Sequence, residues 1–112
     1  MTTIIDERHR AYLDACSTCQ QTCESCAYDC CMTSPDLVEC ARLCLDCAAI
    51  CSACVTLLAR GSRWSDELCQ LCTQVAEACA AECDKHDDID LCRQCAVACR
   101  ACVEECRAMA SA

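Results

Sequence analysis

Apolar residues recur along this chain at alternating steps of three and four residues in four stripes, and 19 of the 20 cysteines lie on these stripes. Such steps place side chains on one face of an α-helix. Four stripes follow one another: Cys16, Cys19, Cys23, Cys26 and Cys30; Cys40, Cys44, Cys47, Cys51 and Cys54; Cys69, Cys72, Cys79 and Cys83; and Cys92, Cys95, Cys99, Cys102 and Cys106. The pattern predicts four amphipathic helices whose inner faces carry thiols.

The single proline and the single glycine lie at breaks between the stripes. Ser34 and Pro35 form a typical helix start, a serine cap followed by proline in the first turn. Gly61 is placed to end that helix in a left-handed conformation. We predict helices over residues 4–32, 35–60, 63–85 and 89–109. Because connections this short make neighbouring helices antiparallel, residues 1–112 are expected to form one all-α domain, an up-down-up-down four-helix bundle with a cysteine-lined core.

Antiparallel pairing of the stripes predicts which residues share a level of the bundle. Five layers are expected: Cys16, Cys54, Cys69 and Cys106; Cys19, Cys51, Cys72 and Cys102; Cys23, Cys47, Ala76 and Cys99; Cys26, Cys44, Cys79 and Cys95; and Cys30, Cys40, Cys83 and Cys92. Cys31 points about 100° away from its stripe and is left over beside the last layer.

The two ends of the bundle differ in the side chains that extend the stripes. Beyond the Cys16 layer the extensions are mostly apolar and predict a closed plug. The plug residues are Tyr12, Leu58, Met109 and Trp64. Beyond the Cys30 layer the extensions include metal-binding groups and predict an open mouth. The mouth residues are Cys31, Met32, His86 and Asp88. His86 is a candidate ligand because it continues the third stripe after Cys83, whereas His9 is assigned to the surface or the plug.

The composition predicts a core of thiols in place of an ordinary core of large apolar side chains. Cysteine accounts for 20 of the 112 residues, and phenylalanine is absent. Cysteine is a small hydrophobe that tolerates burial, so the metal-free chain is expected to fold with modest stability. A formal net charge of −9 offers no basic surface for nucleic acid. Residues 1–14 lack a signal-peptide apolar region and residues 43–59 are short for a membrane span, so a cytoplasmic protein without a membrane partner is expected.

Neither disulfides nor simple packing explains the stripes well. Cβ atoms at these steps on one helix are about 5–6 Å apart, beyond the roughly 4 Å that a disulfide needs. Cross-helix disulfides are possible, but the cytoplasm keeps thiols reduced. Packing alone would be served by leucine or valine without the hazard of oxidation. Metal binding remains, and thiolates select Cu(I), Zn(II) or iron–sulfur clusters.

Charge and geometry favour Cu(I) among these metals. Four-thiolate zinc sites in all five layers would bury about ten uncompensated negative charges, at a large cost. Each Cu(I) replaces one thiol proton, so one ion per cysteine leaves the charge of the core unchanged. A linear S–Cu–S unit with bonds of about 2.3 Å spans about 4.5 Å, which cysteines four positions apart can reach. An iron–sulfur cluster is usually held by irregular loops, for which this chain has little glycine or proline.

The CxxC and CxxxC steps on all four predicted helices resemble those of the cysteine-rich four-helix-bundle copper storage proteins, over essentially the whole chain. The resemblance implies many Cu(I) ions inside the bundle, a cytosolic subgroup without a signal peptide, and assembly into a homo-tetramer. It also implies a histidine ligand at the mouth, where His86 lies. Ala76 departs from an unbroken stripe and leaves the middle layer one thiol short.

We therefore expect a copper storage protein that binds about one Cu(I) per cysteine through all 20 cysteines and His86. No catalytic triad, carboxylate pair or phosphate-binding loop is recognisable, so no enzymatic activity is expected. Two other classes fit the sequence. One is a zinc- or cadmium-binding buffer of the metallothionein type, and the other is an iron–sulfur electron carrier.

Overall fold

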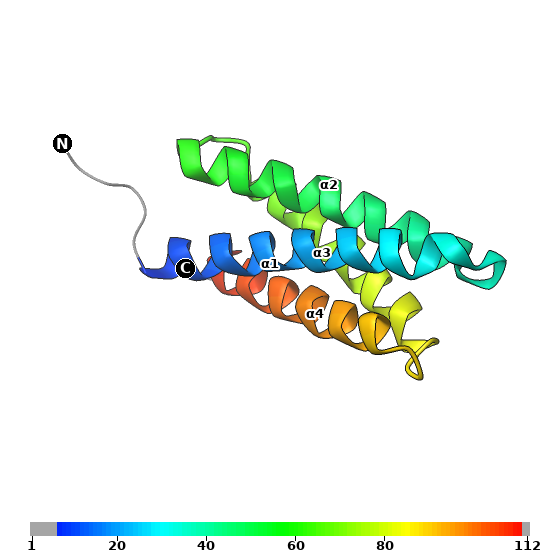
Figure 1. The fold of residues 1–112 in the computed structure, drawn as a ribbon. Coiled ribbons are helices and arrows are strands. Elements are labelled where there is room, and N and C mark those ends of the chain that lie inside the picture. Colours follow the sequence, from blue (N-terminus) through cyan, green and yellow to red (C-terminus); the bar gives the residue numbers. More distant parts are fainter. Residues whose placement is uncertain (1–6, 111–112) are drawn as a thin grey trace.

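The computed structural model describes residues 7–110, and four α-helices make up most of this part (Figure 1). The helices are α1 (Glu7–Asp29), α2 (Val38–Arg60), α3 (Ser65–Asp84) and α4 (Asp90–Ala110). Two short 3-10 turns, η1 (Cys31–Thr33) and η2 (Pro35–Leu37), connect α1 to α2. Residues 4–6, predicted as the start of the first helix, lie outside the described residues.

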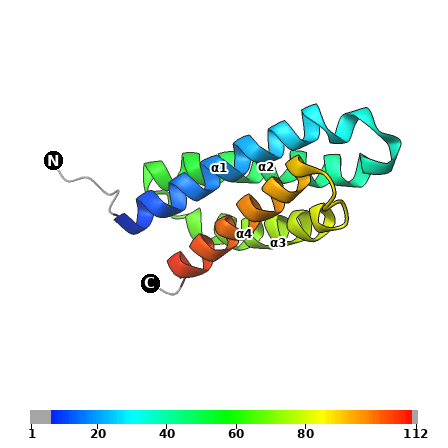
Figure 2. The ribbon, with the colours of Figure 1, turned by 60° about the horizontal axis from the view of Figure 1, so that its bottom comes forward.

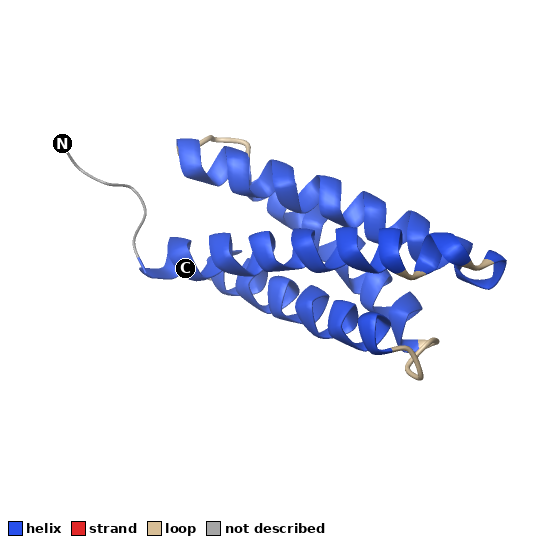
Figure 3. Ribbon diagram, viewed as in Figure 1, coloured by secondary structure: helices blue, strands red, loops and turns tan. Residues whose placement is uncertain are grey.

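Each helix runs antiparallel to its two neighbours in the bundle (Figures 1 and 2). The packed pairs are α1 with α2, α2 with α3, α3 with α4, and α4 with α1. The α2–α3 connection lies at the same end as the start of α1 and the end of α4, whereas the η1–η2 segment and the α3–α4 turn lie at the other (Figure 2). Residues 7–110 contain no strand (Figure 3). The all-α up-down-up-down bundle is confirmed.

The predicted signals at the ends of the second helix are present, but its first turn is tighter than predicted. Ser34 Oγ accepts a hydrogen bond from the Asp36 backbone N–H at 3.4 Å, as expected of a cap. The following residues form η2, and α2 itself begins only at Val38. Gly61 has φ 69° and ψ 36°, and its N–H donates to the carbonyl groups that end α2. A residue with a Cβ is disfavoured in that left-handed conformation.

The core is built mainly of small side chains. Its buried residues are mostly cysteines and alanines, and the larger apolar ones are Tyr12, Leu13, Leu37, Leu58 and Val103. Among residues 7–110, no polar or charged residue is buried. Small side chains remove less apolar surface from water than leucine or phenylalanine do, so the metal-free core contributes less hydrophobic stabilisation than an ordinary core of this size.

One helical segment, Pro35–Arg60, is long and apolar enough to cross a membrane by length and composition. This differs from the expectation drawn from residues 43–59 alone. The core helix of a bundle meets the same criterion, and all five cysteines of α2 are buried against the other helices. The segment by itself therefore indicates a membrane only weakly.

Candidate metal centre

The four helices direct almost every cysteine into one continuous interior. All 20 cysteines are free thiols, and 19 of them are buried. Cys30 is the one that is only half-buried. The predicted stripes therefore face the core, as their spacing requires. The interior is a column of sulfur atoms without a neighbouring buried charge in the described part of the chain.

Sulfur atoms from different helices lie close enough to share a metal ion. Cys23 Sγ is 3.5 Å from Cys95 Sγ, and Cys44 Sγ is 3.6 Å from Cys95 Sγ. Near the other end, Cys102 Sγ is 3.6 Å from both Cys16 Sγ and Cys72 Sγ. A linear S–Cu–S unit needs about 4.5 Å between its sulfurs. Rotation about χ1 supplies shifts of this size, so Cu(I) fits with little movement of the backbone.

The thiols form groups of four that share members. In each group all four Sγ atoms lie within 4.8 Å of one another, and five such groups are Cys16, Cys72, Cys102 and Cys106; Cys19, Cys23, Cys47 and Cys99; Cys23, Cys44, Cys79 and Cys95; Cys26, Cys44, Cys83 and Cys95; and Cys26, Cys31, Cys40 and Cys44. Because Cys23, Cys26, Cys44 and Cys95 each belong to more than one group, four of these five groups join into a network. The Cys16 group shares no member with them, but its Cys102 thiol interacts with Cys19 of the network. A network of shared thiolates suits bridged metal clusters better than separate closed sites.

The predicted layers are correct for α2, α3 and α4, and only partly correct for α1, in which Cys23 and Cys26 keep contacts with their predicted layers but Cys16 and Cys19 contact the next one. Cys51 Sγ lies 3.9 Å from Cys72 Sγ and 4.0 Å from Cys102 Sγ, as predicted. Cys19 of α1 was assigned to this layer, yet its Sγ contacts Cys47 Sγ at 3.7 Å and Cys99 Sγ at 3.8 Å. Helix α1 is thus displaced toward the mouth. The spacing of the cysteines does not determine the axial offset of one helix relative to the others. Side-chain packing between the helices determines it.

The displacement of α1 compensates for Ala76. The middle layer was predicted to be one thiol short, because Ala76 replaces a cysteine of α3 there. In the structure both Cys19 and Cys23 reach this level and complete a four-thiol group with Cys47 and Cys99. The interruption of the third stripe therefore leaves no gap in the network.

Cys31 occupies the core position that was predicted for Cys30. Its Sγ lies 3.7 Å from Cys26 Sγ, and only 1% of its surface is exposed. Helix α1 was predicted to continue to residue 32 but ends at Asp29. The Cys30 carbonyl accepts hydrogen bonds from the backbone N–H of Thr33 at 3.3 Å and from its hydroxyl at 2.6 Å, which stabilises a 3-10 turn. This turn rotates Cys31 inward and leaves Cys30 half-buried at the edge of the core.

Burial favours the protonated form of two thiols near the mouth, Cys31 and Cys92. It raises the pKa of Cys31 to about 11, although hydrogen bonds from Cys40 and Cys26 partly oppose the shift. Burial likewise raises the pKa of Cys92 to about 12. Desolvation disfavours the thiolate, since no cation lies nearby to stabilise it. A bound Cu(I) ion would replace the protons and supply that positive charge.

These shifts predict that alkaline pH destabilises the metal-free protein. Both pKa values are raised in the folded state, so the associated stability is complete below about pH 9 and is lost as pH rises toward about 11–12. We expect Cys31 alone to account for a loss of about 2 kcal/mol by about pH 11. Urea denaturation across this range measures it. A Cys31→Ala variant should show a smaller loss, and a flat pH profile in the unmodified protein would contradict the account.

At the mouth, His86 is positioned by a residue that the sequence analysis did not identify. His86 Nε2 lies 3.3 Å from Glu82 Oε2, and its side chain is 20% exposed. Lys85 Nζ contacts the other carboxylate oxygen at 3.1 Å. Although partial burial opposes the effect, hydrogen bonds from Lys85 and His86 lower the pKa of Glu82. The spacing of four between Glu82, in the last turn of α3, and His86, just after the helix, could have revealed this pair.

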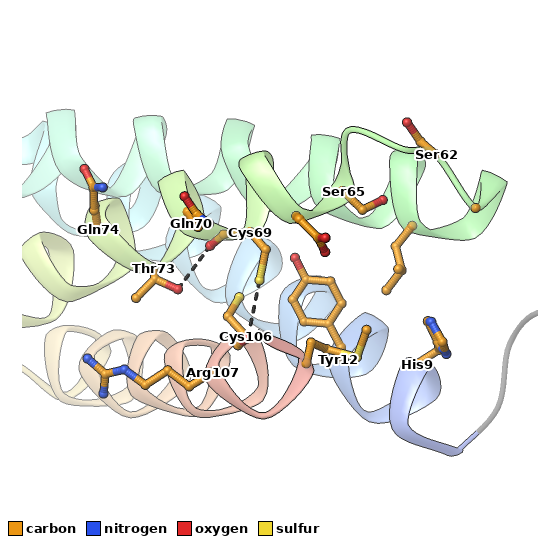
Figure 4. Close-up of a pocket in the computed structure, with 14 residues that line it drawn as sticks. His9, Tyr12, Ser62, Ser65, Cys69, Gln70, Thr73, Gln74, Cys106 and Arg107 are labelled. Atoms are coloured by element: carbon orange, nitrogen blue, oxygen red, sulfur yellow. Dashed lines mark hydrogen bonds between the residues drawn. The ribbon is translucent and has the colours of Figure 1, made fainter. Parts of the chain in front are cut away.

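The predicted plug is only partly correct. Tyr12 and Leu58 are buried, but Trp64 is 57% exposed and lies against Arg63, 5.1 Å from the guanidinium carbon to the ring centroid. A cavity of about 970 Å³ opens at this end, and Met109 contributes to its wall (Figure 4). The short α2–α3 connection directs Trp64 away from the core, because Gly61 and Ser62 complete the turn before it. This end is therefore not closed.

The chain is similar to known proteins along nearly all of its length. The family model for copper storage proteins matches residues 5–111. A Cu(I)-bound structure of the copper storage protein BsCsp3 is 40% identical, with a TM-score of 0.86, and the match covers 93% of this chain and 99% of that one. A cytosolic copper storage protein from Streptomyces lividans, solved with five coppers, is 33% identical, with a TM-score of 0.88 and coverage of 95% and 94%. The uncharacterized cysteine-rich protein YhjQ of Bacillus subtilis (strain 168) is 38% identical over 109 residues, which span 96% of this chain and all of that protein.

Proposed function

The chain belongs to the copper storage protein family, and we propose that it stores about one Cu(I) per cysteine along the whole thiol column of its bundle. The observation that carries this proposal is the network of overlapping four-thiol groups. Its sulfur atoms are close, buried and shared between neighbouring groups. Storage requires a high capacity and shielding of the bound ions from bulk solvent, and a buried network provides both.

The environment of the network favours a monovalent ion over zinc. In the described part of the chain no buried lysine or arginine offsets the charge of excess thiolates. One Cu(I) per thiolate leaves the interior neutral, whereas Zn(II) at one ion per four thiolates leaves it strongly negative. Shared thiols such as Cys44 can also bridge two Cu(I) ions. These features support Cu(I) over a metallothionein-like zinc buffer.

The proposed ligands are all 20 cysteines together with His86. The proposal assigns 19 cysteines to the interior and gives Cys30 and His86 the role of accepting Cu(I) at the mouth. His86 would have to exchange its contact with Glu82 for the metal, or bind through Nδ1. The role involves no catalytic step, in keeping with a family of storage proteins.

The proposed location is the cytoplasm, and the proposed assembly is a homo-tetramer. A similar protein from Streptomyces lividans is described as cytosolic. Twenty free thiols at sulfur–sulfur distances near 4 Å also require a reducing compartment. Several large apolar side chains are exposed on the single chain, among them Tyr28 and Val97, and they are available for contacts between subunits. Sedimentation velocity measures the assembly directly.

The different positions of Cys30 and Cys31 give a test of the ligand assignment. Cys31→Ser should lower the Cu(I) capacity and the stability of the loaded protein, because it removes a buried member of a four-thiol group. Cys30→Ser is the matched comparison, since it changes a half-buried neighbour outside the five groups named above. Each variant should lose about one Cu(I) in a chelator-competed titration, so the contrast lies in the melting temperature of the loaded protein. Equal losses of melting temperature, or a larger loss for Cys30→Ser, would contradict the buried role of Cys31.

Replacing His86 should change the rate of loading rather than the capacity. His86→Ala removes a proposed acceptor at the mouth, so uptake of Cu(I) from a bulky bis-bicinchoninate complex should slow several-fold. The final number of bound ions should change by no more than about one. Gln94→Ala alters an exposed side chain on α4 and serves as the control. Unchanged uptake in the His86 variant, or a large loss of capacity, would exclude this role.

A further inference from the structure

The cavity at the α2–α3 end of the bundle lies directly outside the deepest cysteines. Its walls come from the start of α1, the end of α2, the start of α3 and the end of α4 (Figure 4). At about 970 Å³ it is as large as the sites that bind small organic molecules. The cavity is at the opposite end from His86 and belongs to no part of the mouth.

Two of the buried cysteines line this cavity. Cys69 and Cys106 both contribute to its wall, and Cys69 Sγ donates a hydrogen bond to the Cys106 carbonyl at 3.5 Å. Cys69 is 9% exposed, more than any other buried cysteine. Cys106 also belongs to the four-thiol group with Cys16, Cys72 and Cys102. A molecule in the cavity would therefore reach the network without passing the mouth.

The rest of the wall is mixed in polarity. Tyr12 lies near the middle of the residues drawn in Figure 4, and Asp66 and Gln70 contribute a carboxylate and an amide to the wall. Arg107, also on the wall, pairs with Glu77 at 3.0 Å. A hydrocarbon ligand would cover the Asp66 carboxylate and the Gln70 amide without bonding to them. A small molecule with ammonium, amide or carboxylate groups would bond to them. Thiols built from amino acids combine such groups with a soft sulfur that competes for Cu(I).

We propose that this cavity binds a low-molecular-weight thiol of the amino-acid or peptide type, which removes Cu(I) from Cys69. The proposal rests on the storage function. The thiol sulfur forms a new S–Cu bond as the bond from Cu(I) to the Cys69 sulfur breaks, and a second thiol molecule replaces the other protein thiolate on the same ion in the same way. The proton of each incoming thiol passes to the cysteine sulfur that it displaces, and no electron is transferred. Copper leaves as a two-thiolate complex, and Cu(I) ions held by neighbouring cysteines move into the emptied site.

The test is the thiol-dependent rate of Cu(I) release. The loaded protein is mixed with bicinchoninate as the final acceptor, and glutathione is added at increasing concentration. Gln70→Trp places an indole over the cavity from an exposed position, whereas Ala78→Trp adds the same group to α3 away from it. Gln70→Trp should lower the glutathione-dependent rate by about tenfold, a barrier increase of about 1.4 kcal/mol. Ala78→Trp should leave this rate unchanged, and both variants should keep the glutathione-independent rate.

Equal glutathione dependence in the two tryptophan variants would overturn the proposal. So would equal stimulation by glutathione and by a thiol attached to a long polyethylene glycol chain, which the cavity cannot admit. The Cu(I) capacity of each variant is measured in parallel. Normal capacity with unaltered thiol dependence would reject the cavity site alone, whereas a capacity far below one ion per cysteine would reject the storage proposal itself.

Discussion

Loading with Cu(I) is expected to raise the melting temperature of this protein by about 20 °C or more. The metal-free core consists of small thiols and alanines and offers limited hydrophobic stabilisation. A ligand that binds only the folded state, at a free concentration a thousandfold above its dissociation constant, adds about 4 kcal/mol per site. For a domain of this size each kcal/mol shifts the midpoint by about 4–8 °C. Several sites filled across all four helices should therefore have a large effect.

Circular dichroism melts of the metal-free and loaded protein under anaerobic conditions measure this shift. The same melts after addition of Zn(II) provide the control, since zinc cannot fill the network without leaving excess charge. The increase should grow with each equivalent of Cu(I) until the network is full. Equal melting temperatures with and without Cu(I) would mean that the metal binds outside the core.

The sequence predicts the bundle well because each helix must bury the one face that carries its cysteines. Steps of three and four fix which side of each helix is buried, and single breaks at Pro35 and Gly61 leave only short antiparallel connections. The structure confirms four helices close to the predicted ranges and the predicted level of the cysteines in α2, α3 and α4. These features follow from local periodicity and chain direction alone.

The axial position of α1 and the path of the chain after it could not be predicted in this way. Stripes of identical small residues pack almost equally well at several offsets, so the spacing does not choose among them. The 3-10 turn after Asp29 depends on the hydroxyl of Thr33, which bonds the Cys30 carbonyl. Its consequence is that Cys31 enters the core and Cys30 does not. The helical periodicity predicted the reverse, with Cys30 in the core and Cys31 beside the last layer.

The end beyond Tyr12 shows another limit of periodic patterns. An apolar residue near the end of a stripe was expected to cover the core, but Trp64 lies in the turn after Gly61, where the helical repeat no longer applies. Its side chain points to solvent, and a cavity lies where a plug was expected. The Glu82–His86 pair at the mouth does not follow from the cysteine periodicity, because Glu82 lies off the stripe that Cys79 and Cys83 define.

The largest quantitative expectation concerns capacity. With about one Cu(I) per cysteine, each ion replaces one thiol proton and the buried charge does not change. Because Cys23, Cys26, Cys44 and Cys95 each belong to more than one four-thiol group, neighbouring ions can share their thiolates. Cys19 and Cys23 of α1 fill the level at which α3 carries Ala76, so the column of thiols is continuous from Cys16 to Cys31. The protein should therefore fill along its length rather than at a few isolated sites.

Titration of the reduced, metal-free protein with Cu(I) against a chromophoric competing chelator tests this central claim most directly, with Zn(II) titrated in parallel. Binding of about 20 equivalents of Cu(I), with far weaker retention of Zn(II), is the result predicted by a neutral thiolate network. Saturation at about five equivalents or fewer, or tighter retention of Zn(II) at one ion per four thiols, would contradict it.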